Sequence, residues 1–311
     1  MTSIDRNRNP LAQLGRQTVE KAQQTVAPAV NTVKADSAKV AKQGGDTFEA
    51  GPARQVSASL LGGSKPKDKV FDGQFVGAGG QTFPPGTSLS DIPGVTPRNN
   101  PNPAKTVIYV NGIMTDKAGQ SSDLQAIADR TNAKAIGIHN STEGFISDLA
   151  QCVKDKLDKG HNPAVDSMAD TVYEELKAGR GVHLFAHSQG ALVTSRALTD
   201  VANRLRIEDG MSKADVEKLL SKVKVETFGG AAATFPDGPQ YVHYVNNKDL
   251  VPTWFGQGNG KGADEWARGG GKGAVIHRFE HGSGISGAHG LGDAYLPQRV
   301  DFDKARNGQF N

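Results

Sequence analysis

The sequence has few cysteines, few aromatic residues and no long hydrophobic run. Cys152 is the only cysteine among 311 residues, which excludes an intrachain disulfide framework and a metal site built from several cysteines. No apolar stretch approaches the ~20 residues that a membrane-spanning helix requires. The opening MTSIDRNRNP is not followed by the apolar core of a Sec signal peptide. We therefore expect a protein that is cytoplasmic when made and that, if exported, leaves by a route independent of a signal peptide.

The basic charge is concentrated at the beginning of the chain. Residues 1–69 carry 11 Lys and Arg against 6 Asp and Glu, whereas the remainder carries 25 against 27. A nucleic-acid-binding domain needs a basic face. The nearly neutral remainder therefore argues against nucleic acid as a partner.

Composition divides the chain into three segments. Residues 1–69, with Phe48 as their only aromatic, are too poor in apolar surface to offset the entropy of ordering. We expect a disordered or loosely helical tail. It is either simply solvated, or it binds a membrane surface, a secretion partner or a chaperone. Residues 70–104 are expected to form a turn-rich connecting segment that begins with a short strand at 70–76. Residues 105–311 carry the pattern of a folded domain.

From residue 105 onward, short β-branched apolar runs alternate with segments of helical periodicity. The strand candidates lie at 105–112, 133–140, 181–188, 224–232, 241–252 and 274–279, and the helix candidates at 121–131, 162–179, 189–205 and 212–223. This alternation predicts an α/β fold with a central, mostly parallel sheet flanked by helices. In such sheets the functional groups collect on loops past the carboxyl ends of the strands.

One of these loops places a serine on a tight corner. The stretch HLFAHSQGAL (183–192) passes from an apolar strand into a helix through AHSQG (186–190), which fits the nucleophile-elbow pattern G-x-S-x-G with alanine in first place. Small flanking residues suit this turn because strand and helix pack closely around it. Ser188 is therefore the candidate nucleophile, and the alternative is a serine that only caps the helix. We expect His187 to point away from the working side of the hydroxyl, and His183 to pack within the strand.

A nucleophilic serine needs a carboxylate and a base. In folds that carry the serine on a strand-to-helix elbow, the acid and then the histidine follow it in the chain. Asp249, in NNKDLVP, comes after a strand candidate and is the expected acid, whereas its competitor Asp237 lies in the turn FPDGP. Three histidines follow. We favour His289 as the base, because it lies past the last strand candidate and before an apparent helix start. His281 is the alternative base, and His277 lies inside the strand candidate.

Two backbone N–H groups would complete the site as an oxyanion hole. One donor is expected at Gln189, the residue after the nucleophile. The other is expected in VNGIMTD, where Gly112 lets the chain turn, with Ile113 as the best candidate and Met114 as the second.

A glycine-rich stretch separates the expected acid from the expected base. Trp254, Phe255 and Trp266 lie in or beside it and could line an acyl pocket or lid, or simply pack. The stretch lacks the strand–GK[ST]–helix context of a phosphate-binding loop.

Residues from about Lys105 to Tyr295 resemble α/β-hydrolases of the lipase/esterase type. The resemblance is carried by VNG, by AHSQG, by NNKDLVP with its lipase-like DLVP, and by AHG. Ala186 and Asn111 depart from the commonest family pattern, but neither removes a catalytic group. GIHNSTEGFISDLAQCVKDKL also resembles a stretch of bacterial hydrolases, some of which look like secreted antibacterial or virulence lipases.

The resemblance implies the α/β-hydrolase fold and hydrolysis of carboxylic esters through an acyl-enzyme, with a lipid or a small ester as substrate. Peripheral contact with a membrane would go with a lipid substrate. The mechanism needs no metal and no organic cofactor. Two alternatives share the elbow: an acyltransferase or thioesterase on the same fold, and a non-catalytic binding protein that a fluorophosphonate probe would not label.

Overall fold

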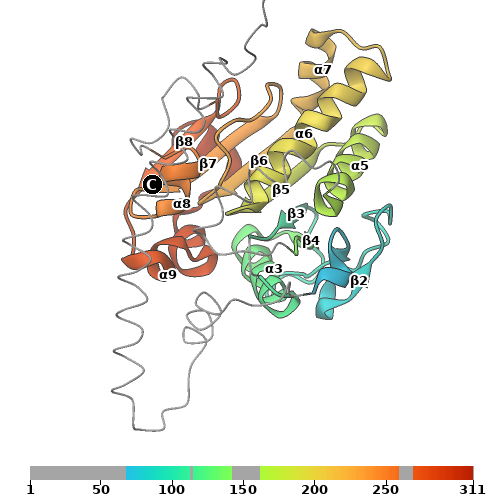
Figure 1. The fold of residues 1–311 in the computed structure, drawn as a ribbon. Coiled ribbons are helices and arrows are strands. Elements are labelled where there is room, and N and C mark those ends of the chain that lie inside the picture. The colour runs from blue at the N-terminus through green and yellow to red at the C-terminus, as the bar shows by residue number, and fades with distance from the viewer. Residues whose placement is uncertain (1–67, 113–114, 142–161, 259–268, 311) are drawn as a thin grey trace, which may run out of the picture.

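An eight-stranded sheet forms the centre of the computed structural model, which describes residues 68–112, 115–141, 162–258 and 269–310. The strand order is β2-β1-β4-β3-β5-β6-β7-β8 (Figure 1). β1 pairs antiparallel with β2 and β4, and the other neighbours pair in parallel. The strands are β1 (Phe75–Val76), β2 (Thr82–Phe83), β3 (Thr106–Val110), β4 (Lys134–Ile138), β5 (Val182–His187), β6 (Val223–Phe228), β7 (Gln240–Asn246) and β8 (Val275–Phe279). The prediction of a mostly parallel α/β sheet is confirmed.

Helices flank the sheet (Figure 1). Two hydrophobic clusters of buried side chains pack between the helices and the sheet. One cluster takes buried side chains from α5 (Pro163–Lys177), α6 (Gly190–Ile207) and α7 (Lys213–Leu220). The other takes them from α3 (Lys117–Thr131) and α10 (Phe302–Arg306). The shorter helical turns are η1 (Lys69–Phe71), η2 (Ala78–Gly80), α8 (Leu250–Phe255), α9 (Gly284–His289), η5 (Leu291–Tyr295) and η6 (Leu296–Gln298). Sheet residues contribute to both clusters, so each face of the sheet is buried.

Local capping explains where two of the long helices begin. At α5 the Asn162 side chain accepts hydrogen bonds from the backbone N–H groups of Ala164 and Val165, as the Asn-Pro sequence predicts. α3 begins four residues before the predicted start at Ser121. Asp116 caps it by accepting a 2.8 Å hydrogen bond from the backbone N–H of Gly119. An aspartate is as good an N-cap as a serine, and here it comes first.

The segment before β3 contributes little regular structure. The strand expected at 70–76 is limited to β1, and Val95 adds an isolated bridge to Ala135. Residues 1–67, which hold nearly all of the expected tail, lie outside the described part of the chain. Among the described helices, none combines the length and the apolar character needed to cross a membrane.

The chain changes its direction of travel across the sheet between β3 and β5. After β3 it passes through α3 to β4 on one side, and after β5 it passes through α6 to β6 on the other. In open α/β sheets, such diverging connections leave a crevice outside the carboxyl ends of the two strands, where ligands bind. Gly112 follows β3 and Ser188 follows β5, so the elbow lies at this crevice.

A buried histidine in β7 predicts acid sensitivity of the fold. His243 is fully buried, with one ring nitrogen 2.8 Å from the Thr227 hydroxyl and the other 2.8 Å from the Gly270 carbonyl oxygen. Burial lowers the pKa of His243 to about 4, whereas in the unfolded chain it is about 6.5. The unfolded state therefore takes up a proton first, and stability falls as the pH drops below 6.5.

His243→Gln is expected to remove this contribution. Between pH 7.5 and pH 5.5 the free energy of unfolding of the variant should fall by about 1.4 kcal/mol less than that of the wild type. Urea unfolding at the two pH values measures the difference, with His281→Gln, at an exposed histidine, as the control. Equal losses in wild type and His243→Gln would contradict the prediction.

Candidate active site

Ser188 occupies a strained backbone position between β5 and α6. Its φ is +54°, in the left-handed region. The other described non-glycine residues with positive φ are Asp68 and Asn132, and Asp and Asn adopt this conformation more readily than other residues. For a serine it costs on the order of 1–3 kcal/mol, and such strain clusters at functional sites. The geometry is that of a strand-to-helix elbow.

Two glycines allow the elbow to form. A Cβ atom at Gly190 would collide with the carbonyl oxygen of Val110, at the end of β3. A Cβ atom at Gly112 would lie 2.8 Å from the Cβ atom of Ser188. Ala186, which stands where the usual pattern has glycine, is fully buried in β5. Close packing thus demands glycine after the serine but tolerates alanine before it.

The backbone of Ser188 is anchored, while its hydroxyl is not. Its N–H donates to the carbonyl oxygen of Phe228 at 3.1 Å, and its own carbonyl oxygen accepts from the N–H of Ala231 at 2.9 Å. The side chain is 2% exposed, and within the described residues its Oγ has no hydrogen-bond partner. Gln189 holds the N-cap position of α6. Ser188 therefore does not act as the helix cap that was the alternative interpretation.

The structure brings Asp249 and His289 together. His289, at the end of α9, has its Nδ1 2.6 Å from Oδ2 of Asp249. Asp249 is 2% exposed and also caps α8, with Oδ1 accepting from the N–H of Val251 at 3.0 Å. A carboxylate only accepts hydrogen bonds, so Nδ1 of His289 carries the proton and Nε2 of the neutral ring is left as the basic atom. This is the orientation a general base requires.

The competing residues lie elsewhere. Asp237 accepts a hydrogen bond from the N–H of Lys272 at 2.9 Å, as expected of an acid in a turn. His277 stacks on Phe310 with ring centroids 4.0 Å apart. His281 is exposed, and its hydrogen bonds to Asn246 are made by its backbone.

His187 does not point away from the site as the sequence suggested. Its ring lies 4.7 Å from that of His289, centroid to centroid, and its Nε2 is 2.8 Å from the carbonyl oxygen of His289. Burial and the neighbouring His289 lower the pKa of His187 to about 3. The ring is therefore neutral, and its Nε2–H donates to that carbonyl. The residue before the nucleophile thus supports the expected base.

The three loops that carry Ser188, Asp249 and His289 meet at the carboxyl ends of the strands. Ser188 directly follows His187, whose ring contacts His289. On the other side, Ser188 is bonded to Phe228, and a Cβ atom at the next residue, Gly229, would lie 2.9 Å from Oδ2 of Asp249. The carboxyl ends of β5, β6 and β7 therefore converge on the same place.

A buried amide network supports the loop expected to hold the oxyanion. Asn111 donates from Nδ2 to the carbonyl oxygens of Gly112 and Asn140, both at 2.9 Å, and its Oδ1 accepts from the N–H of Asn140. Asn140 Nδ2 in turn donates to Oε1 of Gln189 at 2.9 Å. Neither amide was predicted from the sequence to have a role in the site. The signal available was an asparagine within two residues of the end of each of two adjacent strands, β3 and β4.

Gln189 is the expected oxyanion donor that lies within the described part of the chain. Among the described residues, the backbone N–H of Gln189 has no hydrogen-bond acceptor, as an oxyanion donor requires. Ile113 and Met114 lie outside the described residues, as does Trp266. Trp254 and Phe255 are both half-buried in α8, directly after the acid.

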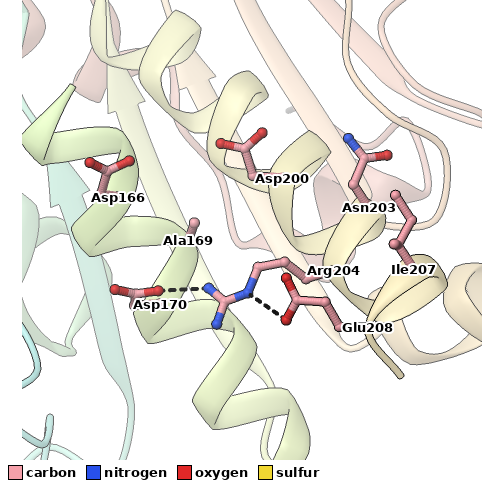
Figure 2. A pocket seen from close by; sticks show the side chains of 8 residues that line it. All are labelled: Asp166, Ala169, Asp170, Asp200, Asn203, Arg204, Ile207 and Glu208. Carbon is pink, nitrogen blue, oxygen red and sulfur yellow. Dashed lines mark hydrogen bonds and ion pairs between the residues drawn. The ribbon is translucent and has the colours of Figure 1, made fainter. Parts of the chain in front are cut away.

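A surface hollow of about 470 Å³ lies between α5 and α6 (Figure 2). Its lining includes Asp166, Asp200 and Arg204, and Arg204 is paired with Asp170 at 2.6 Å. None of the predicted site residues lines it. Within the described residues, no three His, Cys, Asp or Glu side chains are arranged to hold a metal ion.

The site is thus defined by its geometry. It consists of a serine at a strained elbow, a paired histidine and aspartate, and buried amides behind them. No family model, curated protein or solved structure matches the chain.

Proposed function

We propose that this chain is a serine hydrolase of the α/β-hydrolase type that cleaves carboxylic ester bonds through an acyl-enzyme. One observation carries the proposal. Ser188, held at φ +54° with an Oγ that has no hydrogen-bond partner among the described residues, lies at the carboxyl ends of the strands, where His289 is hydrogen-bonded to Asp249 at 2.6 Å. A strained serine and an oriented imidazole gathered at the same ends of the strands support nucleophilic catalysis.

The topology supports the same assignment. The sheet is parallel except for the edge strands β1 and β2. The elbow follows β5, at the crevice where the connections after β3 and β5 diverge to opposite sides. The acid and the base come later in the chain, after β7 and β8, in the order that α/β-hydrolases use. Fold alone does not imply function, so the proposal depends on the site.

The reaction follows from the positions of the groups. His289 Nε2 takes the proton of Ser188 as Oγ attacks the acyl carbonyl carbon, and the bond to the alcohol breaks when the imidazolium returns that proton to the leaving oxygen. Asp249 stabilises the imidazolium. The backbone N–H of Gln189, with Ile113 as the expected second donor, holds the oxyanion. Water, activated by the same imidazole, then releases the acid and frees Ser188.

Labelling with a small fluorophosphonate probe tests the proposal. The probe should form one covalent adduct, mapped to Ser188 by peptide mass spectrometry, and should block turnover of p-nitrophenyl esters. Release of free acid from the ester distinguishes hydrolysis from acyl transfer, which would require an added acceptor. An unlabelled protein without esterase activity would indicate the non-catalytic alternative.

The aromatic residues after the acid predict a preference for longer acyl chains. If Trp254 lines the acyl pocket, each additional buried CH₂ contributes about 0.8 kcal/mol, roughly a fourfold gain in kcat/KM. A series from acetate to decanoate should show a steady rise in the wild type and a flatter one in Trp254→Ala. Phe83→Ala, on the distant strand β2, serves as the control. A preference for acetate in both enzymes would identify a small-ester hydrolase with Trp254 as ordinary packing.

A further inference from the structure

A further residue, Tyr295, contacts the acid of the Asp249–His289 pair. The phenol of Tyr295, in η5, donates a 2.6 Å hydrogen bond to Oδ2 of Asp249. His289 Nδ1 bonds the same oxygen, also at 2.6 Å. Oδ2 therefore receives two short hydrogen bonds from residues that are distant from Asp249 in sequence.

The direction of this hydrogen bond is settled by what surrounds the phenol. The backbone N–H of Asn246 donates to the Tyr295 oxygen at 3.3 Å, so the phenol's own proton is directed to Asp249. Burial, reinforced by the charge of Asp249, raises the pKa of the phenol well above its usual value of 10. Tyr295 therefore keeps its proton at neutral pH and donates it to Asp249.

The ring of Tyr295 is fixed by its neighbours. It is fully buried, and it packs edge-on against Phe279 at 5.3 Å and against His187 at 6.2 Å between ring centroids. A Cβ atom at Gly229 would lie 2.9 Å from the ring. A side chain held on several sides can in turn fix the carboxylate that it contacts.

We propose that Tyr295 is a positioning residue, which holds Asp249 in place and takes up part of the negative charge that Asp249 presents to His289. The proposal rests on the proposed function, because it assigns Tyr295 a part in the same reaction. A hydrogen bond to a carboxylate spreads its charge. Loss of that bond leaves more charge facing the imidazole, which then keeps its proton to a higher pH.

Tyr295→Phe tests the proposal by removing only the phenol oxygen. Asp249 keeps its bonds to His289 and Val251, so no carboxylate oxygen is orphaned. The acid limb of the kcat/KM–pH profile should move to higher pH by about one unit. At the pH optimum kcat should fall about tenfold with KM within about twofold. Tyr241→Phe is the matched control, because this buried phenol donates to the carbonyl oxygen of Pro236 instead.

A second readout does not depend on turnover. The proton NMR signal of the His289 Nδ1–H, identified by its loss in His289→Gln, should move in Tyr295→Phe and stay in place in Tyr241→Phe. If the protein hydrolyses no ester but this signal moves, the positioning role stands and the proposed function fails. If the protein hydrolyses esters but the pH profile and the His289 Nδ1–H signal of Tyr295→Phe are those of the wild type, Tyr295 is only a packing residue. That result would overturn the proposal.

A fluorinated tyrosine at position 295 keeps the ring and its packing, and covers the case in which Tyr295→Phe does not fold. The more acidic phenol forms a stronger hydrogen bond to Asp249 and should move the acid limb to lower pH, opposite to the phenylalanine variant. An unchanged acid limb would overturn the proposal.

Discussion

Ser188→Ala is expected to lower kcat for ester hydrolysis by about 10⁶-fold. Ser188 is the residue that the elbow places at the switch point, with an Oγ that has no hydrogen-bond partner among the described residues. In the proposed reaction, removing this oxygen removes the nucleophile, so no acyl-enzyme can form. Initial rates on a p-nitrophenyl ester, with burst kinetics for acyl-enzyme formation, measure the effect.

Ser195→Ala is the matched control. Ser195 is a buried serine within α6, and its hydroxyl donates to the carbonyl oxygen of Thr234 at 2.6 Å. This variant should keep activity near that of the wild type and lose only about 1 kcal/mol of stability. Substantial turnover by Ser188→Ala would refute the proposed chemistry altogether. Ser188→Ala should be at least as stable as the wild type, because the Ser188 hydroxyl has no hydrogen-bond partner to lose within the described part of the chain.

His289→Ala should be nearly as damaging, with kcat also reduced by about 10⁶-fold. In the proposed reaction the imidazole takes the proton from Ser188 and returns it to the leaving alcohol. In the folded protein its Nδ1 is bound to Asp249, and its backbone carbonyl is held by His187. Fluorophosphonate labelling should slow in parallel, because it needs the same activated serine.

His281→Ala separates the two histidines that the sequence left open. His281 is exposed and makes its hydrogen bonds to Asn246 through its backbone. We expect kcat/KM of this variant to stay within about twofold of the wild type. A large loss in His281→Ala with activity retained in His289→Ala would move the base to His281.

The fold class could be predicted because it depends on local pattern. Short β-branched runs alternating with amphipathic helices leave little choice but a parallel sheet covered on both faces. Helix boundaries were less predictable, since several polar residues before α3 can cap a helix. Asp116 caps α3, although the helix was predicted to begin at Ser121. Which residue caps the helix depends on where the chain leaves β3, and helix propensities carry no information about that position.

The supporting residues of the site could not be predicted. Nothing in the sequence marks Tyr295 as a partner of Asp249, because the two are 46 positions apart and tyrosine is a common core residue. His187 was expected to face away because only its place in the motif was visible. Its ring meets His289 because the chain between them returns to the same edge of the sheet.

The sequence by itself determined the α/β class and the small residues that let Ser188 occupy an elbow. These follow from periodicity and from steric demands within a few residues of the chain. Only the tertiary structure decided that Asp249 pairs with His289 rather than with His281, and that Tyr295, His187 and the buried amides stand behind them. The physical reason is that hydrogen bonds and ring contacts depend on distances of a few ångström between atoms. Those distances are set by strand order and loop packing, not by separation along the chain.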